Sequence, residues 1–299
     1  MRALLGLGTY RTQGVVEAAE AALQFGVDWV DTAPNYQHGQ AETRLAPFLK
    51  AYGGIRVSTK VGFVAGPQQD EAVQAGVLSE AEAGSGFSLD PRYVTWQVAR
   101  SAAALGRCPD ITFVHNPEHG DPAPTALAER VEQAFRALEK CCDQGLIHGY
   151  GVATWSALHD GSLTVPGLID LARAAGGPFH RLRAVQLPLS LIQLGPIADA
   201  IDGHGVLAEA QSAGLAVFAS APLGGGELPE FITPAAAEEL LPGVSPLRII
   251  LGTVAYVPGV SRILLSASTP EHWAEAVRAT SGEPFDSDVL RRITDAFST

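Results

Sequence analysis

The stretch Asp28-Trp29-Val30-Asp31-Thr32-Ala33-Pro34-Asn35-Tyr36 shows the unit from which this chain is built. A short apolar run ends at Asp31, and turn-forming and polar residues follow at once. A short apolar run bounded by turn residues is typical of a buried strand. The stretch therefore predicts a strand that leaves the core just before an Asp and a Tyr.

Seven further runs of this kind recur along the chain and alternate with helical stretches. Together the eight runs predict strands at Ala3–Gly6, Asp28–Asp31, Ile55–Thr59, Ile111–Val114, His148–Val152, Ala184–Leu187, Leu215–Ala219 and Arg262–Leu265. Eight strand–helix units in roughly 250–300 residues are typical of a (β/α)8 or TIM barrel of the α/β class. A doubly wound open sheet is the rival fold, but no glycine fingerprint follows the first strand.

Amphipathic segments fill the spaces between these strands. The clearest segment runs from Leu127 to Leu138 with its apolar residues on one face, and Gly145 marks its end. Further helices are expected over residues 15–25, 91–105, 207–213 and 270–280.

No linker divides the chain, so we expect one domain over residues 1–299. One connection, residues 62–90, is long and rich in Gly, Ala, Gln and Glu. Loops of this length in compact domains are commonly functional. We expect this one to lie over the carboxyl-terminal face of the barrel.

Composition excludes several classes of function. The 299 residues include 46% apolar and 17% charged residues, and the net charge is −12 at pH 7. Binding to nucleic acid or to an anionic membrane is therefore not expected, and no apolar stretch is long enough to cross a bilayer. Three cysteines form no disulfide or metal pattern, so we expect a cytoplasmic protein without a metal. His115 and His119 are four residues apart, but the intervening Pro117 disfavours a helical zinc site.

Side chains suited to proton transfer follow the predicted strands at the end where a barrel builds its active site. Asp31 and Tyr36 follow the second strand, Lys60 the third and His115 the fourth. A nearby Lys60 ammonium favours the phenolate of Tyr36 and is expected to lower the phenol's pKa from its usual value near 10. Asp31 would hold Lys60 in place, and a neutral His115 would donate a hydrogen bond to a substrate oxygen. This set is suited to protonate and polarise a carbonyl.

A series of short motifs extends this pattern over nearly the whole chain. In order they are Gly6-Leu7-Gly8-Thr9, the stretch from Asp31 to Tyr36 with Glu42, Ser58-Thr59-Lys60-Val61-Gly62, Val114-His115-Asn116-Pro117-Glu118, Gly151-Val152, Val185-Gln186 and Ala221-Pro222-Leu223-Gly224-Gly225-Gly226. The ordered set resembles the aldo-keto reductase superfamily and is most similar to the branch that acts on aldoses. The resemblance implies a (β/α)8 barrel that moves hydride between a nicotinamide cofactor and a carbonyl.

The resemblance also implies roles for individual residues. Tyr36 is the general acid or base, His115 orients the carbonyl, and Lys60 with Asp31 tunes the tyrosine. The implied cofactor is NADP or NAD. Its expected contacts are Thr9, Thr154, Gln186, Ser220, Pro222, Leu223, Gly224, Gly226 and Ser268.

Several of these cofactor positions depart from the family pattern. Ala153-Thr154 stands where a Ser-Asn pair commonly binds the nicotinamide amide, and Ser220 where an aromatic ring often stacks on the nicotinamide. Ser268 stands where an Arg often binds the 2′-phosphate, and Gln37 replaces the glycine after the tyrosine. One explanation is that branches of this family vary at these positions and that NAD lacks the 2′-phosphate and needs no Arg. The other is that nicotinamide binding has been lost and the tyrosine, lysine and histidine serve a reaction without net redox change.

Three functional interpretations therefore stay open. The first is an NAD(P)-dependent reductase of a small carbonyl or sugar-like compound. The second is a cofactor-independent lyase, dehydratase or isomerase that uses Tyr36, Lys60 and His115. The third is a non-catalytic binding protein, which has no evident need for a lysine-tuned tyrosine. The sequence leaves the substrate, the direction of the reaction and the oligomeric state undetermined.

Overall fold

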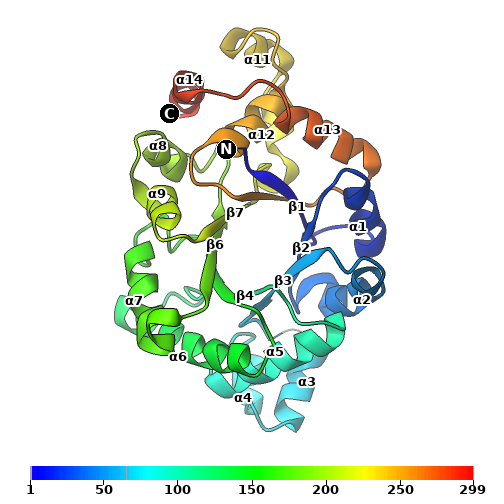
Figure 1. Ribbon diagram of the computed structural model, residues 1–299, viewed down its shortest axis with the longest axis vertical. Helices are drawn as coiled ribbons and strands as arrows, with labels where there is room; N and C mark the ends of the chain where they lie inside the picture. The colour runs from blue at the N-terminus through cyan, green and yellow to red at the C-terminus, as the bar shows by residue number, and fades with distance from the viewer. Residues whose placement is uncertain (1, 65, 299) are drawn as a thin grey trace.

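A closed barrel of eight parallel strands forms the centre of the computed structural model, which describes residues 2–64 and 66–298 (Figure 1). The strands pair in chain order, and the last strand closes onto the first. Their bounds are β1 Leu4–Gly8, β2 Trp29–Asp31, β3 Arg56–Val61, β4 Ile111–His115, β5 Tyr150–Ala153, β6 Leu182–Pro188, β7 Ala216–Ser220 and β8 Arg262–Leu265. The (β/α)8 prediction is confirmed. Residues 1, 65 and 299, which the predicted domain includes, lie outside the described part.

Large apolar side chains fill the interior of the barrel. Trp29 of β2, Phe113 of β4 and Phe218 of β7 pack together there. The ring centroid of Phe218 lies 5.1 Å from that of Trp29 and 5.6 Å from that of Phe113. Since successive strand residues point to opposite faces, their neighbours Val30 and Val114 face the surrounding helices and join the main core. The barrel is therefore packed solid, and ligands are restricted to its ends.

Helices cover the outside of the barrel, and at least one helix follows each strand (Figure 1). The helices that pack around the barrel are α1 Val15–Gln24, α2 Ala41–Ala51, α5 Pro91–Leu105, α6 Pro124–Asp143, α7 Val165–Gly176, the pair α8 Gly195–Ile201 and α9 Gly205–Ser212, α12 Pro246–Tyr256 and α13 Pro270–Thr280. The amphipathic segment from Leu127 to Leu138 lies in α6, and its apolar face is buried. Gly145 follows α6 with a φ of 70°, a left-handed conformation that glycine adopts without strain.

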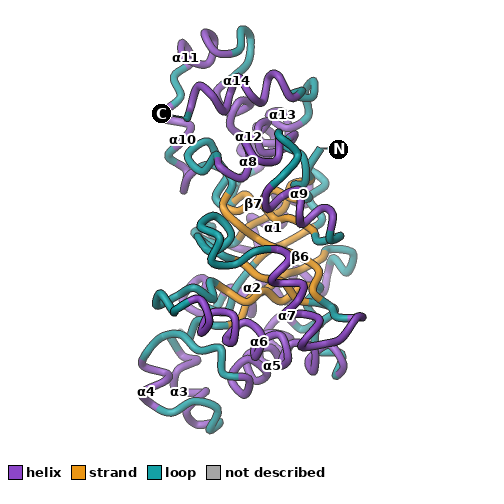
Figure 2. Tube along the Cα trace, turned by 90° about the vertical axis from the view of Figure 1, so that its left-hand side faces the viewer, coloured by secondary structure: helices purple, strands orange, loops and turns teal. Residues whose placement is uncertain are grey.

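The connection over residues 62–90 is not the continuous loop that its composition suggests. It contains α3 (Pro67–Gln74) and α4 (Glu80–Gly84), which pack with the start of α5 through a small apolar cluster. Both helices lie at one end of the elongated molecule in both views (Figures 1 and 2). The two ends of the connection pair through Phe63 and Phe87. Short helices of this kind are stabilised by tertiary packing, so sequence periodicity alone does not reveal them.

The opposite end of the molecule is formed by the connection between β7 and β8 and by the last helix (Figure 2). This connection contains α10 (Leu228–Phe231) and α11 (Pro234–Leu240) before α12, and α14 (Ser287–Phe297) packs with them in a second apolar cluster. Among the described residues, none of the helices has the length and apolar character needed to cross a membrane.

Candidate active site

Four side chains suited to acid–base chemistry lie at the carboxyl ends of three neighbouring strands. Asp31 ends β2, Lys60 is the penultimate residue of β3, and His115 ends β4. Tyr36 begins the short 3-10 turn, Tyr36–Gly39, that follows β2. These three strands are neighbours in the barrel, so residues far apart in the sequence converge at one end of it.

An ion pair between Lys60 and Asp31 lies at the centre of this site. Nζ of Lys60 is 2.6 Å from Oδ2 of Asp31 and donates a second hydrogen bond to the carbonyl of Thr32 at 2.9 Å. Only 1% of the Lys60 side chain and 5% of the Asp31 side chain are exposed. Burial alone disfavours the ammonium, but the Asp31 carboxylate and the Tyr36 phenol together outweigh it, and the pKa of Lys60 lies above its usual value. Lys60 is therefore positively charged over the physiological pH range.

Tyr36 packs against this ammonium. Nζ of Lys60 lies 4.9 Å from the centroid of the Tyr36 ring, and the ring of Tyr10 lies 5.2 Å away on the loop after β1. Burial raises the pKa of Tyr36, and the nearby Lys60 only partly offsets this shift. The prediction of a lowered pKa is therefore wrong for this structure, because loss of water around the phenol outweighs one ammonium already paired with Asp31. The phenol is therefore protonated at neutral pH and has a proton that it can donate.

His115 is enclosed by aromatic rings. Its ring centroid lies 4.8 Å from that of Phe63 and 6.2 Å from that of Tyr36, both in edge-to-face geometry. Burial, the charge of Lys60 and the neighbouring His119 hold the pKa of His115 well below its usual value of 6.5. The neutral imidazole can donate one N–H to a substrate oxygen.

The second carboxylate oxygen of Asp31 accepts two further hydrogen bonds. Ser58 Oγ donates to Oδ1 at 2.7 Å, and Gln186 Nε2 donates to the same oxygen at 3.3 Å. Gln186, which the resemblance assigns to the nicotinamide amide, is thus turned toward Asp31. Ser58 is not among the residues predicted for the site. Its spacing of two from Lys60 in one strand was the available signal, because such residues share a face.

Two predicted cofactor residues use their hydroxyl groups within the protein. Thr9 Oγ1 donates to the carbonyl of Asp31 at 3.1 Å. Thr154 Oγ1 accepts a hydrogen bond from the amide of Leu158 at 3.5 Å. Both threonines are buried at the carboxyl end of the barrel, after β1 and β5. Their side chains hold these loops, whatever else binds there.

A glycine-rich turn, Gly224–Gly226, follows Pro222 and Leu223 in the connection after β7. The three glycines have φ values of 57°, 76° and 103°, a region open to glycine and strained for other residues. A Cβ added to Gly225 would lie 3.7 Å from Nη1 of Arg11, so the guanidinium of Arg11 lies beside this turn. A backbone turn beside a guanidinium is suited to the diphosphate of a dinucleotide.

The position expected for the adenine end is different. Ser268 Oγ accepts a hydrogen bond from the amide of Gln13 at 3.3 Å, so it joins the segment before α13 to the loop before α1. The first turn of α13 carries the acidic Glu271 and no Lys or Arg. Ser220 ends β7, partly exposed, and offers no ring for stacking. The first turn of α13 therefore supplies no Lys or Arg that could pair with a 2′-phosphate.

Gln37 joins two loops of the site. It has a left-handed φ of 52°, and its Nε2 donates to the carbonyl of Thr12. The left-handed conformation costs a non-glycine residue about 1–2 kcal/mol, a strain that a glycine at this position would not have. The hydrogen bond offsets part of this strain and ties the turn of Tyr36 to the loop after β1.

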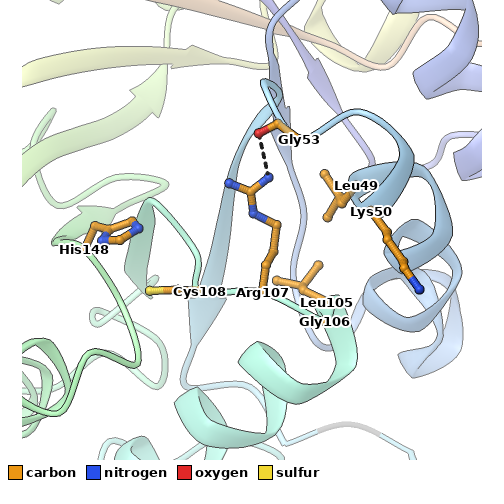
Figure 3. A pocket seen from close by; sticks show the side chains of 8 residues that line it. All are labelled: Leu49, Lys50, Gly53, Leu105, Gly106, Arg107, Cys108 and His148. Carbon is orange, nitrogen blue, oxygen red and sulfur yellow. Dashed lines mark hydrogen bonds between the residues drawn. The ribbon is translucent and has the colours of Figure 1, made fainter.

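A cavity of about 370 Å³ lies at the opposite, amino-terminal end of the barrel (Figure 3). Lys50, Arg107, Cys108 and His148 contribute to its lining, and Arg107 donates to the carbonyl of Gly53 at 3.4 Å. Burial raises the pKa of the Cys108 thiol, which makes it a poor nucleophile. Within the described ranges, no group of three or more His, Cys, Asp or Glu residues is placed to hold a metal ion. The side chains suited to acid–base chemistry therefore lie at the carboxyl-terminal end of the barrel, away from this cavity.

Parts of this chain are similar in sequence to several curated proteins. An aldo/keto reductase from Synechocystis sp. is 26% identical over 79% of this chain, and a D-threo-aldose 1-dehydrogenase from Pseudomonas sp. is 31% identical over 45% of it. A probable voltage-gated potassium channel subunit beta from Oryza sativa subsp. japonica is 27% identical over 50% of the chain. The matches span 65%, 42% and 41% of the respective relatives' lengths.

Solved structures resemble the fold over nearly its whole length. An aldo-keto reductase, AKR11C1, from Bacillus halodurans in its holo form has a TM-score of 0.70 and 18% identity, with 97% of this chain and 91% of that chain covered. An aldo/keto reductase from Klebsiella pneumoniae in complex with NADP and acetate has a TM-score of 0.68 and 20% identity, with 98% and 90% covered. The sequence profile of the Aldo/keto reductase family matches residues 4–297. This chain is a member of the Aldo/keto reductase family.

Proposed function

We propose that this protein is an NAD(P)-dependent oxidoreductase that interconverts a small carbonyl or sugar-like compound and its alcohol. The observation that carries the proposal is the position of the Tyr36 ring beside the buried Lys60–Asp31 ion pair and the imidazole of His115. These groups match the requirements of carbonyl reduction, which needs a proton donor and a hydrogen-bond donor at one oxygen.

Each residue has a distinct part in the proposed reduction. Tyr36 donates its phenolic proton to the carbonyl oxygen as negative charge develops there. The Lys60 ammonium stabilises the resulting phenolate, and Asp31 keeps that ammonium in place. A bound nicotinamide cofactor supplies the hydride. In the reverse direction the phenolate is the base, so oxidation of the alcohol is expected to increase with pH.

His115 orients the substrate in this proposal. Because its imidazole is neutral, it donates an N–H to the carbonyl oxygen without competing for the proton of Tyr36. The enclosing Phe63 ring restricts rotation of the imidazole. The same oxygen is thereby held within reach of both donors.

The proposed cofactor contacts lie around the same end of the barrel. Arg11 and Gly224–Gly226 are assigned to the diphosphate, on the geometry described above. Gln186 is assigned to the nicotinamide amide, and it would have to exchange its bond to Asp31 for that contact. The NADP complex of the Klebsiella pneumoniae relative supports a nicotinamide cofactor as the first choice to test.

Aldoses are the substrate class we propose to test first. The matching segment of a D-threo-aldose 1-dehydrogenase supports this choice. Tyr10 and Trp155 follow β1 and β5, and both are more than half exposed. Aromatic faces at the mouth of the site are suited to pack against sugar rings.

A second candidate function is acid–base catalysis without a cofactor, as in a lyase, dehydratase or isomerase. The hydrogen bonds that Gln186 and Thr154 make within the protein favour this alternative. Tyr36, Lys60 and His115 would then move protons without a hydride.

The deciding experiment is titration of the purified protein with NADPH and with NADH. Binding is measured as quenching of tryptophan fluorescence and as energy transfer to the reduced nicotinamide. Saturable binding at micromolar concentration supports the proposal. Absence of binding at millimolar concentration of both cofactors contradicts it and favours the second candidate. Tyr36→Phe is expected to lower the rate of aldose oxidation by a factor of about 10²–10⁴, while the affinity for the cofactor stays unchanged.

A further inference from the structure

A chain of two hydrogen bonds reaches Asp31 from the barrel interior. The indole Nε1 of Trp29 donates to Ser58 Oγ at 2.9 Å, and Ser58 Oγ donates to Asp31 Oδ1 at 2.7 Å. All three side chains are buried. The other oxygen of Asp31, Oδ2, is the one that pairs with Lys60. Asp31 is therefore held between the ammonium and this chain.

The directions of these hydrogen bonds follow from chemistry. An indole N–H can only donate, so the Ser58 oxygen must accept from Trp29. The single hydroxyl hydrogen of Ser58 is then left for Asp31, and an ionised carboxylate can only accept. Both hydrogen bonds therefore point toward Asp31, and the chain fixes the orientation of its carboxylate.

The first member of the chain is itself firmly held. The guanidinium carbons of Arg56 and Arg262 lie 4.9 Å and 5.1 Å from the Trp29 ring centroid. Asp28 joins the two cations, since its oxygens lie 2.6 Å from Arg56 and 2.8 Å from Arg262. Arg262 also donates to the carbonyl of Leu5 at 2.7 Å. These contacts fix the indole ring and, with it, the direction in which its N–H points.

We propose that Trp29 and Ser58 are positioning residues that hold Asp31 as an oriented carboxylate. Through Asp31 they keep the Lys60 ammonium beside the ring of Tyr36. Neither residue touches the position of a substrate, and both act through the ion pair. The catalytic consequence rests on the proposed function of Tyr36, whereas the hydrogen-bonded chain itself does not.

Loss of the Ser58 hydroxyl is expected to make the electrostatic field at Tyr36 more negative. The positive end of its O–H dipole no longer offsets the charge of Asp31, so the negative field at Tyr36 increases. The Asp31 carboxylate, which pairs with Lys60, also loses one of the hydrogen bonds that fix its orientation. Both changes disfavour the phenolate, so we expect the alkaline ionisation that governs alcohol oxidation to move to higher pH in Ser58→Ala.

The first test uses no substrate. The chain has four tryptophans, and Trp29→Phe identifies the indole N–H signal of Trp29 in a ¹H–¹⁵N correlation spectrum. We expect Asp31→Asn to move that signal upfield through Ser58, and Ser58→Ala to move it and to speed its hydrogen exchange. Thr112→Ala is the matched control, because Thr112 is a buried strand residue of β4 whose hydroxyl has no hydrogen-bond partner among the described residues. A Trp29 signal that neither Asp31→Asn nor Ser58→Ala moves overturns the proposal.

The second test is the pH profile of aldose oxidation. We expect Ser58→Ala to lower kcat by about tenfold, as for loss of one hydrogen bond to a charged group, with KM for the aldose within about twofold. The alkaline limb should move up by roughly half a pH unit, and Ser58→Thr, which keeps a hydroxyl, should restore it. A loss of kcat without a shift of the limb, or an equal loss in Thr112→Ala, refutes a positioning role. If the wild-type protein oxidises no aldose, the proposed function fails, while the indole spectrum still decides whether the chain exists.

Discussion

Replacement of Lys60 by Met gives the sharpest test of the site's electrostatics. The Lys60 side chain is 1% exposed and its Nζ lies 2.6 Å from a carboxylate that is 5% exposed. Removing one partner of such a buried pair leaves an uncompensated charge and typically costs about 3–5 kcal/mol. Asp31 keeps its hydrogen bonds from Ser58 and Gln186, so we expect a loss near the lower limit, about 3 kcal/mol.

The double variant Asp31→Asn with Lys60→Met separates a charge effect from a packing effect. It removes both charges and keeps similar side-chain volumes, so we expect it to be more stable than Lys60→Met alone by about 1–3 kcal/mol. Urea unfolding monitored by circular dichroism at pH 7.5 measures the two single variants, Lys60→Met and Asp31→Asn, and the double variant, provided that the slope against denaturant is unchanged. A cost of Lys60→Met below about 1 kcal/mol, or a double variant whose loss equals the sum of the single losses, would refute the account of a buried, coupled pair.

Three further predictions follow from the residues around the site. Burial raises the pKa of Glu42, which accepts a hydrogen bond from Thr59 at 2.5 Å. The folded protein therefore binds this proton more tightly than the unfolded chain, and this stability is present below pH 4.5 and lost as the pH rises through the raised pKa. Glu42→Gln should then raise the urea midpoint more at pH 7.5 than at pH 4.5, and a greater gain at acid pH would contradict the sign. Gln37→Gly should be more stable than Gln37→Ala by about 1 kcal/mol, because both lose the bond to Thr12 and only alanine keeps a strained φ of 52°; equal midpoints would show that the left-handed conformation carries no strain. Ser268→Arg should increase the affinity for NADPH relative to NADH by about tenfold through a bidentate contact to the 2′-phosphate, as measured by fluorescence titration, and an unchanged ratio would place the adenine ribose elsewhere.

The amino-acid sequence determined the barrel and the meeting place of the acid–base residues. Runs such as Trp29–Asp31 and Ile111–His115 are apolar and bounded by turn residues, so their number and spacing were sufficient to predict eight strands in a closed barrel. Parallel neighbouring strands bring their carboxyl ends together, and this geometric rule placed Asp31, Lys60 and His115 side by side. The sequence pattern was therefore sufficient to predict those site residues that lie directly at the end of a strand.

The tertiary structure alone decided the electrostatics of that site. The pKa of Tyr36 moves up because burial outweighs a paired ammonium, and no spacing in the sequence measures burial. Gln186 donates a hydrogen bond to Asp31 across the barrel. Ser58 accepts a hydrogen bond from the indole of Trp29 because β2 and β3 pair with Asp31 opposite Ser58. Sequence periodicity fixes which face of a strand a side chain occupies. Its hydrogen-bond partner and its protonation state depend on register, on distance and on the exclusion of water, and these exist only once the barrel has closed.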